Sequence, residues 1–129
     1  MTVVLDASAV LALLFGEPGA QEVADAIADG AVIGSVNLSE TATILVRHGR
    51  NPLSVLAPVV AQVEVESFGE ADAYAAAALY PALAAKGLSF GDRACLALAL
   101  RLNTAAMTAD HAWDGLRHGV TVRVIRMAR

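Results

Sequence analysis

The chain has 129 residues, of which 57% are hydrophobic, 5% aromatic and 17% charged. This length suits one domain over residues 1–129, and the composition excludes an intrinsically disordered chain, which would be poor in apolar residues. Nine Lys and Arg residues against thirteen Asp and Glu residues give a formal net charge of −4. Taken over the whole chain, this charge disfavours a simple nucleic-acid-binding protein, because phosphate contacts come from clustered Lys and Arg.

The charges are unevenly distributed along the chain. Residues 1–72 carry ten acids and two bases, a sum of −8, whereas residues 73–129 carry three acids and seven bases, a sum of +4. A solvated acidic surface explains most of this asymmetry, although a net acidic protein can still present a basic face.

Other sequence features concern the compartment. The only cysteine, Cys95, can form no internal disulfide and lies in an apolar run, so we expect a buried, unreactive thiol. The N-terminus lacks the features of a signal peptide, and no apolar stretch is long enough to span a bilayer. We therefore expect a soluble, cytoplasmic protein without a membrane partner.

Short apolar strands and helices alternate in the first half of the chain. A β-branched run predicts a strand at residues 2–5, followed by a helix at residues 7–15. After a turn at residues 17–19, a second helix runs to about residue 29, followed by a strand at residues 31–34. Helices then follow at residues 38–48 and 52–60.

The second half continues the alternation. It predicts a weak strand at residues 63–65, a helix at residues 70–86 that Pro81 kinks or breaks, and a helix at residues 90–102. A strand at residues 105–108, a short helix at residues 112–116 and a last strand at residues 120–125 complete the chain. Such alternation is typical of a mostly parallel sheet covered on both faces, a three-layer α/β/α sandwich.

Four acidic residues lie at junctions between these elements: Asp6, Glu40, Asp92 and Asp110. Helix capping alone could explain the position of each acid. Asp6 and Asp110 follow strands, and the segments 37–40 and 89–92 both resemble capping boxes, with an acid three residues after a polar cap. A cap contributes roughly 1 kcal/mol, which is reason enough to find any one of these acids.

Together the acids favour a shared site. The carboxyl ends of parallel strands lie at one edge of the sheet, and ligands bind there where the strand order reverses. Asp6, Glu40 and Asp110 follow strands and should lie at this edge. Asp92 opens the helix that leads into the strand at residues 105–108. We therefore expect it at the opposite edge unless the preceding loop brings residues 89–92 back.

Converging carboxylates would raise one another's pKa and require a compensating cation. Oxygen donors without His or Cys favour Mg²⁺ or Mn²⁺ over zinc. Such a site suits metal-assisted hydrolysis of a phosphodiester.

Four segments of the sequence carry a family resemblance: VLDASA at residues 4–9, VNLSE at 36–40, LSFGDRACLA at 88–97 and MTADHAW at 107–113. Together they resemble the PIN domain, specifically the VapC type of toxin ribonuclease. The resemblance runs nearly end to end and finishes in the last predicted strand. It implies a Mg²⁺- or Mn²⁺-dependent endoribonuclease, with Asp6, Glu40, Asp92 and Asp110 as its catalytic, metal-binding cluster.

The same resemblance implies partners and neighbouring residues. It implies an RNA substrate, a homodimer, and inhibition by a VapB-type antitoxin in a hetero-oligomer. Ser8 and Thr108 match family positions beside the acids, where a hydroxyl could orient a carboxylate. Local hydrogen bonding at a helix start explains these two hydroxyls equally well. Arg93 could contact substrate phosphate or pair with the acids, and the resemblance leaves these alternatives open.

Two residues near the fourth acid have competing interpretations. Asp114 lies one helical turn after Asp110 and could support the metal site. It is more simply a solvated acid paired with Arg117 or His118. Trp113 is expected to anchor the core rather than to stack on a base.

Two other classes of function were compared with the nuclease. A phospho-receiver would require paired acids after the first strand, and here Asp6 stands alone. It would also require a mid-chain acceptor Asp and a late Lys, whereas the chain offers Glu64, Glu66 and the single Lys86. The remaining alternative is a PIN-like regulatory subunit acting mainly with its antitoxin. We expect that partner to cover an apolar groove built partly by residues 9–15.

Overall fold

The computed structural model describes residues 2–115 and 119–125. Within these residues five parallel strands form one sheet in the order β3-β2-β1-β4-β5. The strands are β1 (Val3–Leu5), β2 (Ala31–Gly34), β3 (Glu64–Glu66), β4 (Ala105–Thr108) and β5 (Val122–Val124). β1 therefore lies at the centre, paired with β2 on one side and with β4 on the other.

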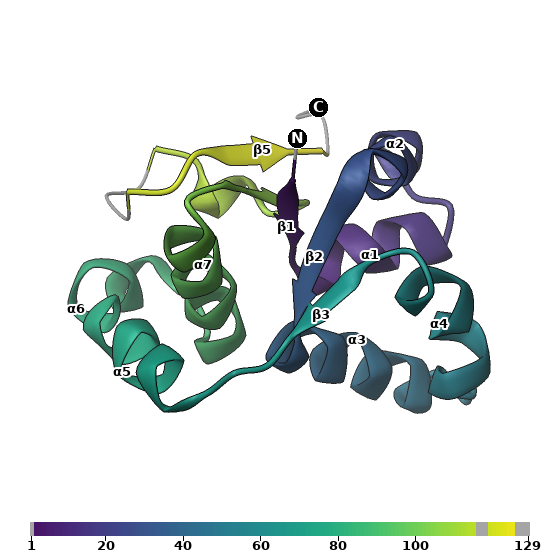
Figure 1. Ribbon diagram of the computed structural model, residues 1–129, viewed down its shortest axis with the longest axis horizontal. Coiled ribbons are helices and arrows are strands. Elements are labelled where there is room, and N and C mark those ends of the chain that lie inside the picture. The colour runs from purple at the N-terminus through teal and green to yellow at the C-terminus, as the bar shows by residue number, and fades with distance from the viewer. Residues whose placement is uncertain (1, 116–118, 126–129) are drawn as a thin grey trace.

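Helices cover both faces of the sheet (Figure 1). One face carries α1 (Ala7–Leu14), α2 (Ala20–Gly30), α3 (Ser35–Arg47) and α4 (Pro52–Val60). The other carries α5 (Glu70–Ala78), α6 (Tyr80–Leu83) and α7 (Phe90–Leu102), with the 3₁₀ turns η1 (Ala84–Lys86) and η2 (His111–Trp113) in the connections. The predicted α/β architecture with helices on both sides of a parallel sheet is confirmed.

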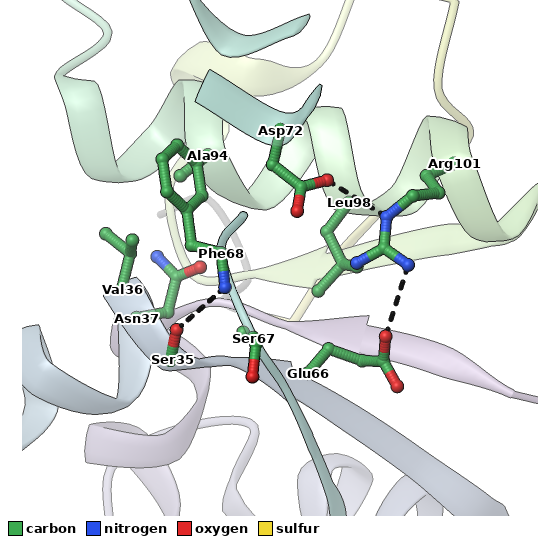
Figure 2. Close-up of a pocket in the computed structure, with 11 residues that line it drawn as sticks. Ser35, Val36, Asn37, Glu66, Ser67, Phe68, Asp72, Ala94, Leu98 and Arg101 are labelled. Atoms are coloured by element: carbon green, nitrogen blue, oxygen red, sulfur yellow. Dashed lines mark hydrogen bonds and ion pairs between the residues drawn. The ribbon is translucent and has the colours of Figure 1, made fainter. Parts of the chain in front are cut away.

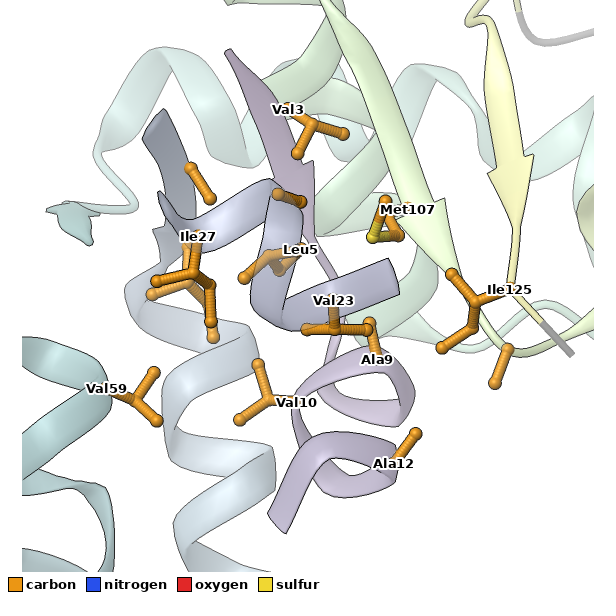
Figure 3. Packing of buried hydrophobic residues seen from close by; sticks show 14 of the residues in the cluster. Val3, Leu5, Ala9, Val10, Ala12, Val23, Ile27, Val59, Met107 and Ile125 are labelled. Atoms are coloured by element: carbon orange, nitrogen blue, oxygen red, sulfur yellow. The ribbon is translucent and has the colours of Figure 1, made fainter. Parts of the chain in front are cut away.

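The central strands send alternate side chains into two hydrophobic cores, as the two-residue period of a strand requires. Val3 and Leu5 of β1 belong to the core shared with α1–α4, which Figure 3 shows together with Val10 and Val23. Val4 belongs to the second core, on the side of α7. Burying such side chains contributes roughly 1.5–3 kcal/mol each relative to exposure. This contribution fixes which face each strand residue occupies.

Two buried residues of the second core match the sequence expectations. Trp113 is fully buried and packs in this core, as predicted for an anchor. Cys95 is also fully buried and unpaired. Among the described residues, no helix combines the length and apolarity needed to cross a membrane.

Several element boundaries differ from the prediction. α3 begins at Ser35, after the Gly34 N-cap, whereas the predicted helix begins at residue 38. The predicted capping box over residues 37–40 is therefore wrong, because Asn37 already lies inside the helix. β3 and β5 also differ from the predicted ranges: β3 is shifted by one residue, and β5 is shorter.

The predicted helix over residues 70–86 is broken into α5, α6 and η1. Pro81 lies in the first turn of α6, where its missing N–H group is not required by the helix. The helix predicted at residues 112–116 is instead the short turn η2, and its predicted end at residue 116 lies outside the described residues.

Candidate active site

The strand order reverses at β1. The chain proceeds from β1 to β2 on one side of the sheet and later returns to β4 on the other side. The carboxyl ends of β1 and β4 therefore flank the crevice in which α/β proteins bind ligands. Asp6 directly follows β1, and its backbone N–H donates to the Met107 carbonyl of β4 at 3.1 Å.

Asp6 is a buried carboxylate held by three donors. Its side chain caps α1 by accepting from the Ala9 N–H at 2.8 Å. The Ser8 hydroxyl lies 2.7 and 2.9 Å from the two carboxylate oxygens, and the Thr108 hydroxyl donates at 2.5 Å. Burial raises the pKa of Asp6 to about 6, with a smaller contribution from Asp92, although the hydrogen bonds lower it. Ser8 and Thr108 thus hydrogen-bond to this acid, and their supporting role in a metal site stays a prediction.

Glu40 lies near the start of α3 and is held by a residue of its own helix. The Asn37 side-chain nitrogen donates to Glu40 Oε1 at 2.8 Å and to the Gly91 carbonyl of α7 at 3.1 Å. The Glu40 carboxylate lies against Gly91 so closely that a Cβ there would be 2.0 Å from Oε2. Burial first, and Asp92 second, raise the pKa of Glu40. Gly91 thus leaves the space that this carboxylate occupies.

Asp92 lies in the first turn of α7, where it completes the predicted capping box. Its carboxylate accepts from the Ser89 N–H at 2.8 Å, and its own N–H donates to the Ser89 hydroxyl at 3.2 Å. Burial raises the pKa of Asp92, and the charge of Asp110 raises it further.

The expectation that Asp92 starts at the opposite edge is wrong. α7 leads into the first residue of β4, so it must run antiparallel to the strands. Its first turn consequently lies at their carboxyl ends, on the same edge as the other acids. The loop before α7 needs no special path to bring Asp92 there.

Asp110 and Asp114 flank η2 and are exposed. The Asp110 carboxylate caps this turn by accepting from the Ala112 N–H at 2.9 Å, and the Asp110 N–H donates to the Thr108 hydroxyl at 3.0 Å. Asp114 ends the turn. Its predicted partners, Arg117 and His118, lie outside the described residues.

The four acids share one electrostatic environment centred on Asp92. Its charge acts on Asp6 and Glu40, and Asp110 acts on it in turn. The charges of three of these acids also act on the buried Cys95 thiol. Burial raises its pKa well above the ordinary range, and the charges of Asp6, Asp92 and Glu40 raise it further.

The acids share an edge without forming a closed metal cage. Within residues 2–115 and 119–125, no group of three His, Cys, Asp or Glu side chains converges closely enough to hold a metal ion. The capping bonds explain this spacing, because Asp92 and Asp110 each turn toward a backbone N–H group. The acids therefore lie close enough for their charges to affect one another's pKa, but their side chains do not point at a common metal position.

The residues nevertheless fit an oxygen-binding divalent cation. Within the described part of the chain, no Lys or Arg forms an ion pair with any of the four acids, although burial and mutual repulsion act on them. Asn37 Oδ1 is buried without a hydrogen-bond partner beside Glu40. Carboxylate and amide oxygens are the donors that Mg²⁺ and Mn²⁺ prefer.

Arg93 follows Asp92 in α7, and its side chain contacts α5 and α6. Its guanidinium donates to the Ala76 carbonyl at 3.0 Å and lies 5.3 Å from the Tyr80 ring centroid and 5.9 Å from that of Phe90. The alternative of a salt bridge with the acidic cluster is not seen among the described residues. Its contact with substrate phosphate stays a prediction.

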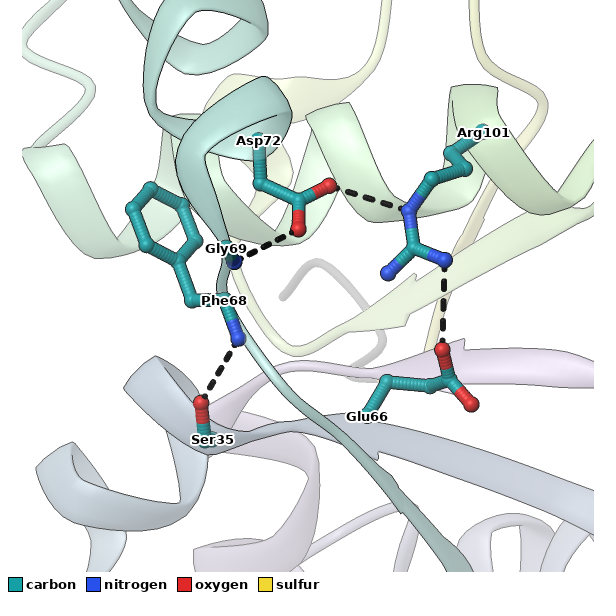
Figure 4. Close-up of polar contacts among 6 residues, drawn as sticks. All are labelled: Ser35, Glu66, Phe68, Gly69, Asp72 and Arg101. Carbon is teal, nitrogen blue, oxygen red and sulfur yellow. Dashed lines mark hydrogen bonds and ion pairs between the residues drawn. The ribbon is translucent and has the colours of Figure 1, made fainter.

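A polar network joins β3, α5 and α7 next to the site (Figures 2 and 4). Arg101 of α7 pairs with Glu66 of β3 at 3.2 Å and with Asp72 of α5 at 2.9 Å. The Phe68 N–H donates to the Ser35 hydroxyl at the start of α3 at 3.1 Å. These contacts surround a small pocket that Asn37 also lines (Figure 2). The network fixes the edge strand β3 relative to the helices that carry Glu40 and Asp92.

Sequence reasoning missed the roles of Asn37 and Gly91, although both lie in the quoted motifs. Asn37 and Glu40 are three residues apart, a spacing that places two side chains on the same face of a helix. Correct placement of the start of α3 would have revealed this pair. The contact of Glu40 with Gly91 joins two distant helices, and no local pattern indicates it.

Comparisons with known proteins agree with this fold. Solved structures that resemble the chain include VapBC2 from Rickettsia felis bound to a promoter DNA fragment, at 17% identity and a TM-score of 0.76, covering 96% of this chain and 98% of that chain. A toxin–antitoxin complex from Klebsiella pneumoniae gives 15% identity and a TM-score of 0.75, covering 98% and 99%. Mycobacterium tuberculosis VapC20, a toxin that cleaves the sarcin–ricin loop, has 18% sequence identity and a TM-score of 0.72. This match covers 90% of this chain and 97% of that chain.

At such identities these likenesses establish the fold alone. No curated protein matches the chain significantly. The family model of the PIN domain, in contrast, matches residues 3–118. That match extends over most of the sequence and includes all four acids, so the chain belongs to the PIN domain family.

Proposed function

We propose that this protein is a metal-dependent endoribonuclease that hydrolyses RNA phosphodiester bonds and acts as the toxin of a toxin–antitoxin pair. The observation that carries the proposal is the shared field of Asp6, Glu40 and Asp92 at the crevice between β1 and β4. Asp110 acts on the same field through Asp92. Capping alone does not explain why four acids lie at one edge of the sheet with no ion pair to a base among residues 2–115 and 119–125.

In this proposal Asp6, Asp92 and Asp110, with help from Glu40, hold Mg²⁺ or Mn²⁺ through carboxylate oxygens. The chemistry supplied on binding is a lower pKa for water and neutralisation of charge on the phosphoryl group. Asp114 has a supporting role at most, because it is exposed at the far end of η2.

The neighbouring hydroxyl and amide groups orient the carboxylates. Ser8 and Thr108 donate to Asp6 from two directions, which restricts the rotation of its carboxylate. Asn37 holds Glu40 in the same way. Oriented oxygens reduce the reorganisation needed when a cation and an RNA phosphate enter together.

The proposal is tested by replacing Asp6 or Asp92 with Asn and measuring RNA cleavage by the purified proteins in Mg²⁺ and in Mn²⁺. Asn keeps the size and capping ability of Asp but removes the charge, so cleavage should be abolished while the fold persists. Asp25→Asn is the matched control, because Asp25 is exposed on α2, away from the four acids, and accepts a hydrogen bond from the Gln21 side chain. Undiminished metal-dependent cleavage by the Asp6 and Asp92 variants would overturn the proposal.

In cells, the ends of cleaved RNA can be mapped after induction of the wild type and of Asp6→Ala. New ends that appear only with the wild type would identify the RNA and the cleavage sequence.

The proposed partner is a VapB-type antitoxin, together with a second copy of the chain in a hetero-oligomer. The solved complexes from Rickettsia felis and Klebsiella pneumoniae support this part, since both contain a toxin and its antitoxin. The expected partner surface built partly by residues 9–15 stays a prediction. Leu11 and Leu14 are half-buried, and the Phe15 ring lies 5.6 Å from that of His48.

A second apolar surface of the described residues is a groove between α3 and α4. It has a volume of about 550 Å³ and is lined by Leu38, Ala42, Pro52, Leu53, Leu56, Ala57, Val60 and Ala61. Leu53 is 85% exposed there, which makes it a suitable anchor for a partner.

Co-expression with the product of the neighbouring small gene tests this partner. Leu53→Glu should weaken the complex while leaving RNA cleavage intact. If the protein acted mainly as a regulatory subunit, the complex would form but the free protein would cleave no RNA under any metal condition.

A further inference from the structure

Aromatic side chains gather beside Asp92. The chain has six aromatic residues, three Phe, two Tyr and one Trp. Tyr80 and Phe90 lie beside the Arg93 guanidinium, and Phe68 packs against Phe90. Tyr80 is 58% exposed and Phe90 50% exposed. Half of the aromatic residues of this chain therefore gather in one partly exposed cluster, and Phe90 precedes Asp92 by only two residues.

The Phe90 ring is supported by two neighbours. Phe68 meets it edge to face, with ring centroids 5.6 Å apart and an interplanar angle of 86°. The guanidinium of Arg93 lies over the rings of both Phe90 and Tyr80, while its Nη1 is fixed to the Ala76 carbonyl. An exposed ring held in this way loses little further conformational freedom when a ligand stacks on it.

Phe90 also lines an open pocket that includes Glu40. This pocket has a volume of about 540 Å³ and is lined by Val36, Ser39, Glu40, Thr43, Ile44, Arg47 and Phe90. It therefore contains one of the proposed catalytic acids, an aromatic ring and, two turns further along α3 from Glu40, an exposed Arg47. No ion pair between described residues involves that arginine.

We propose that Phe90 is a stacking platform for an unpaired RNA base next to the cleaved phosphate, with Arg47 contacting a phosphate further along the strand. This inference rests on the proposed ribonuclease function of the same site. Aromatic rings stack on any base, and they reach bases only where the RNA is single-stranded or splayed open. The pocket thus selects unpaired segments. Arg93 is a positioning residue that holds the platform in place.

The mixed character of this pocket favours RNA over a protein partner. Its lining combines two hydroxyls, a carboxylate and a guanidinium with one aromatic ring and the aliphatic side chains of Val36 and Ile44, and it reaches the acidic site through Glu40. A cation next to an aromatic surface matches the alternation of phosphate and base along a strand. The groove between α3 and α4 is lined almost entirely by apolar side chains and better suits a protein.

The test measures binding without cleavage. Fluorescence anisotropy of a labelled, mixed-sequence single-stranded RNA of about 12 nucleotides is recorded in EDTA, for the wild type and for Phe90→Leu. Leu keeps an apolar side chain but lacks a ring, so binding should weaken about 5- to 150-fold. Phe90→Tyr keeps the ring and should bind as the wild type does. Tyr74→Leu is the matched control, because Tyr74 is 72% exposed on α5 outside this cluster.

A strand of equal length without bases separates stacking from charge. Phe90→Leu and the wild type should bind this abasic strand equally, whereas Arg47→Gln should weaken binding of both strands and reduce its dependence on salt. Arg93→Met should weaken binding of the RNA but not of the abasic strand.

The inference would be overturned if Phe90→Leu bound the RNA as tightly as the wild type does, or if Phe90→Leu lost as much affinity for the abasic strand as for the RNA. It would also be overturned if Phe90→Leu changed the sedimentation of the protein while its RNA binding stayed the same. The last result would identify the cluster as a protein interface. Ring-dependent binding by a protein that never cleaves RNA would instead contradict only the proposed catalytic function.

Discussion

Thr108 donates a hydrogen bond to the Asp6 carboxylate across 102 residues of sequence. The contact joins the carboxyl ends of β1 and β4, the two strands that flank the candidate active site. The same hydroxyl accepts from the Asp110 N–H, so one side chain relates two of the four acids. Thr108 thereby positions both the most buried acid and one of the exposed acids.

Thr108→Val should shift the pH dependence of RNA cleavage. The Thr108 hydroxyl is the hydrogen-bond donor that lowers the pKa of Asp6 most, so its removal should raise that pKa above about 6. The acid limb of the rate profile should then move to higher pH, because a proposed metal ligand must be ionised. Ser8→Ala should move it in the same direction. Ser54→Ala, at an exposed hydroxyl bonded to the Asn51 carbonyl, is the control, and an unshifted profile for Thr108→Val would contradict the prediction.

Asp6 should make the metal-free protein less stable as the pH rises. Its pKa is raised from 3.8 to about 6 in the folded state, so between these values the folded protein retains a proton that the unfolded chain has lost. The free energy of unfolding should therefore fall as the pH increases through this window, by about 3 kcal/mol, and level off above it.

Asp6→Asn isolates this effect, because it removes one titrating group from the comparison. Denaturant unfolding in EDTA at several pH values between 4 and 8 should show a smaller decline for the variant than for the wild type. Parallel curves for the two proteins would indicate that Asp6 has an ordinary pKa.

Gly91→Ala should displace the Glu40 carboxylate without unfolding the protein. The new Cβ would lie 2.0 Å from Oε2, which the flexible end of the glutamate can avoid by rotating away. Cleavage should then fall to the level of Glu40→Gln, with only a small change in melting temperature. Gly69→Ala is the matched control, because its Cβ would meet only an Asp72 oxygen at 3.8 Å. Full activity of Gly91→Ala would show that the position of Glu40 is unimportant.

Arg101→Met should lower stability in a salt-dependent manner and leave cleavage unchanged. Arg101 pairs with Glu66 and Asp72 while remaining 41% exposed, and pairs of this kind contribute roughly 0–1 kcal/mol each. We expect a loss of about 1 kcal/mol in dilute buffer that shrinks in concentrated salt, measured by urea unfolding. A loss of RNA cleavage would instead assign Arg101 to the active site.

Local patterns predicted much of the fold. Short apolar runs between helices located the strands near Val3, Val32 and Ala106, and the capping box of Ser89 with Asp92 followed from a spacing of three residues. These features depend on neighbours in sequence, so a single sequence is enough to reveal them. The start of α3 was missed because its cap, Gly34, has no side chain to signal it.

The geometry of the site depended on contacts that sequence does not display. The edge at which Asp92 lies follows from the direction of α7 relative to β4, and it was misjudged although the element order was correct. The contact between Glu40 and Gly91 requires α3 and α7 to pack together. The raised pKa of Asp6 depends on burial by the surrounding fold and cannot be read from residue types alone.

The central place of β1 also has a consequence for the timing of synthesis. Chains leave the ribosome from the N-terminus, and β1 obtains its second neighbour only when β4, residues 105–108, has emerged. Until then Asp6 lacks its contact with Thr108, and the crevice lacks β4, one of the two strands that flank it. A nascent chain that ends before β4 therefore contains three of the four acids but lacks the second strand beside Asp6, so RNA near the translating ribosome meets the complete arrangement only after residues 105–110 have emerged.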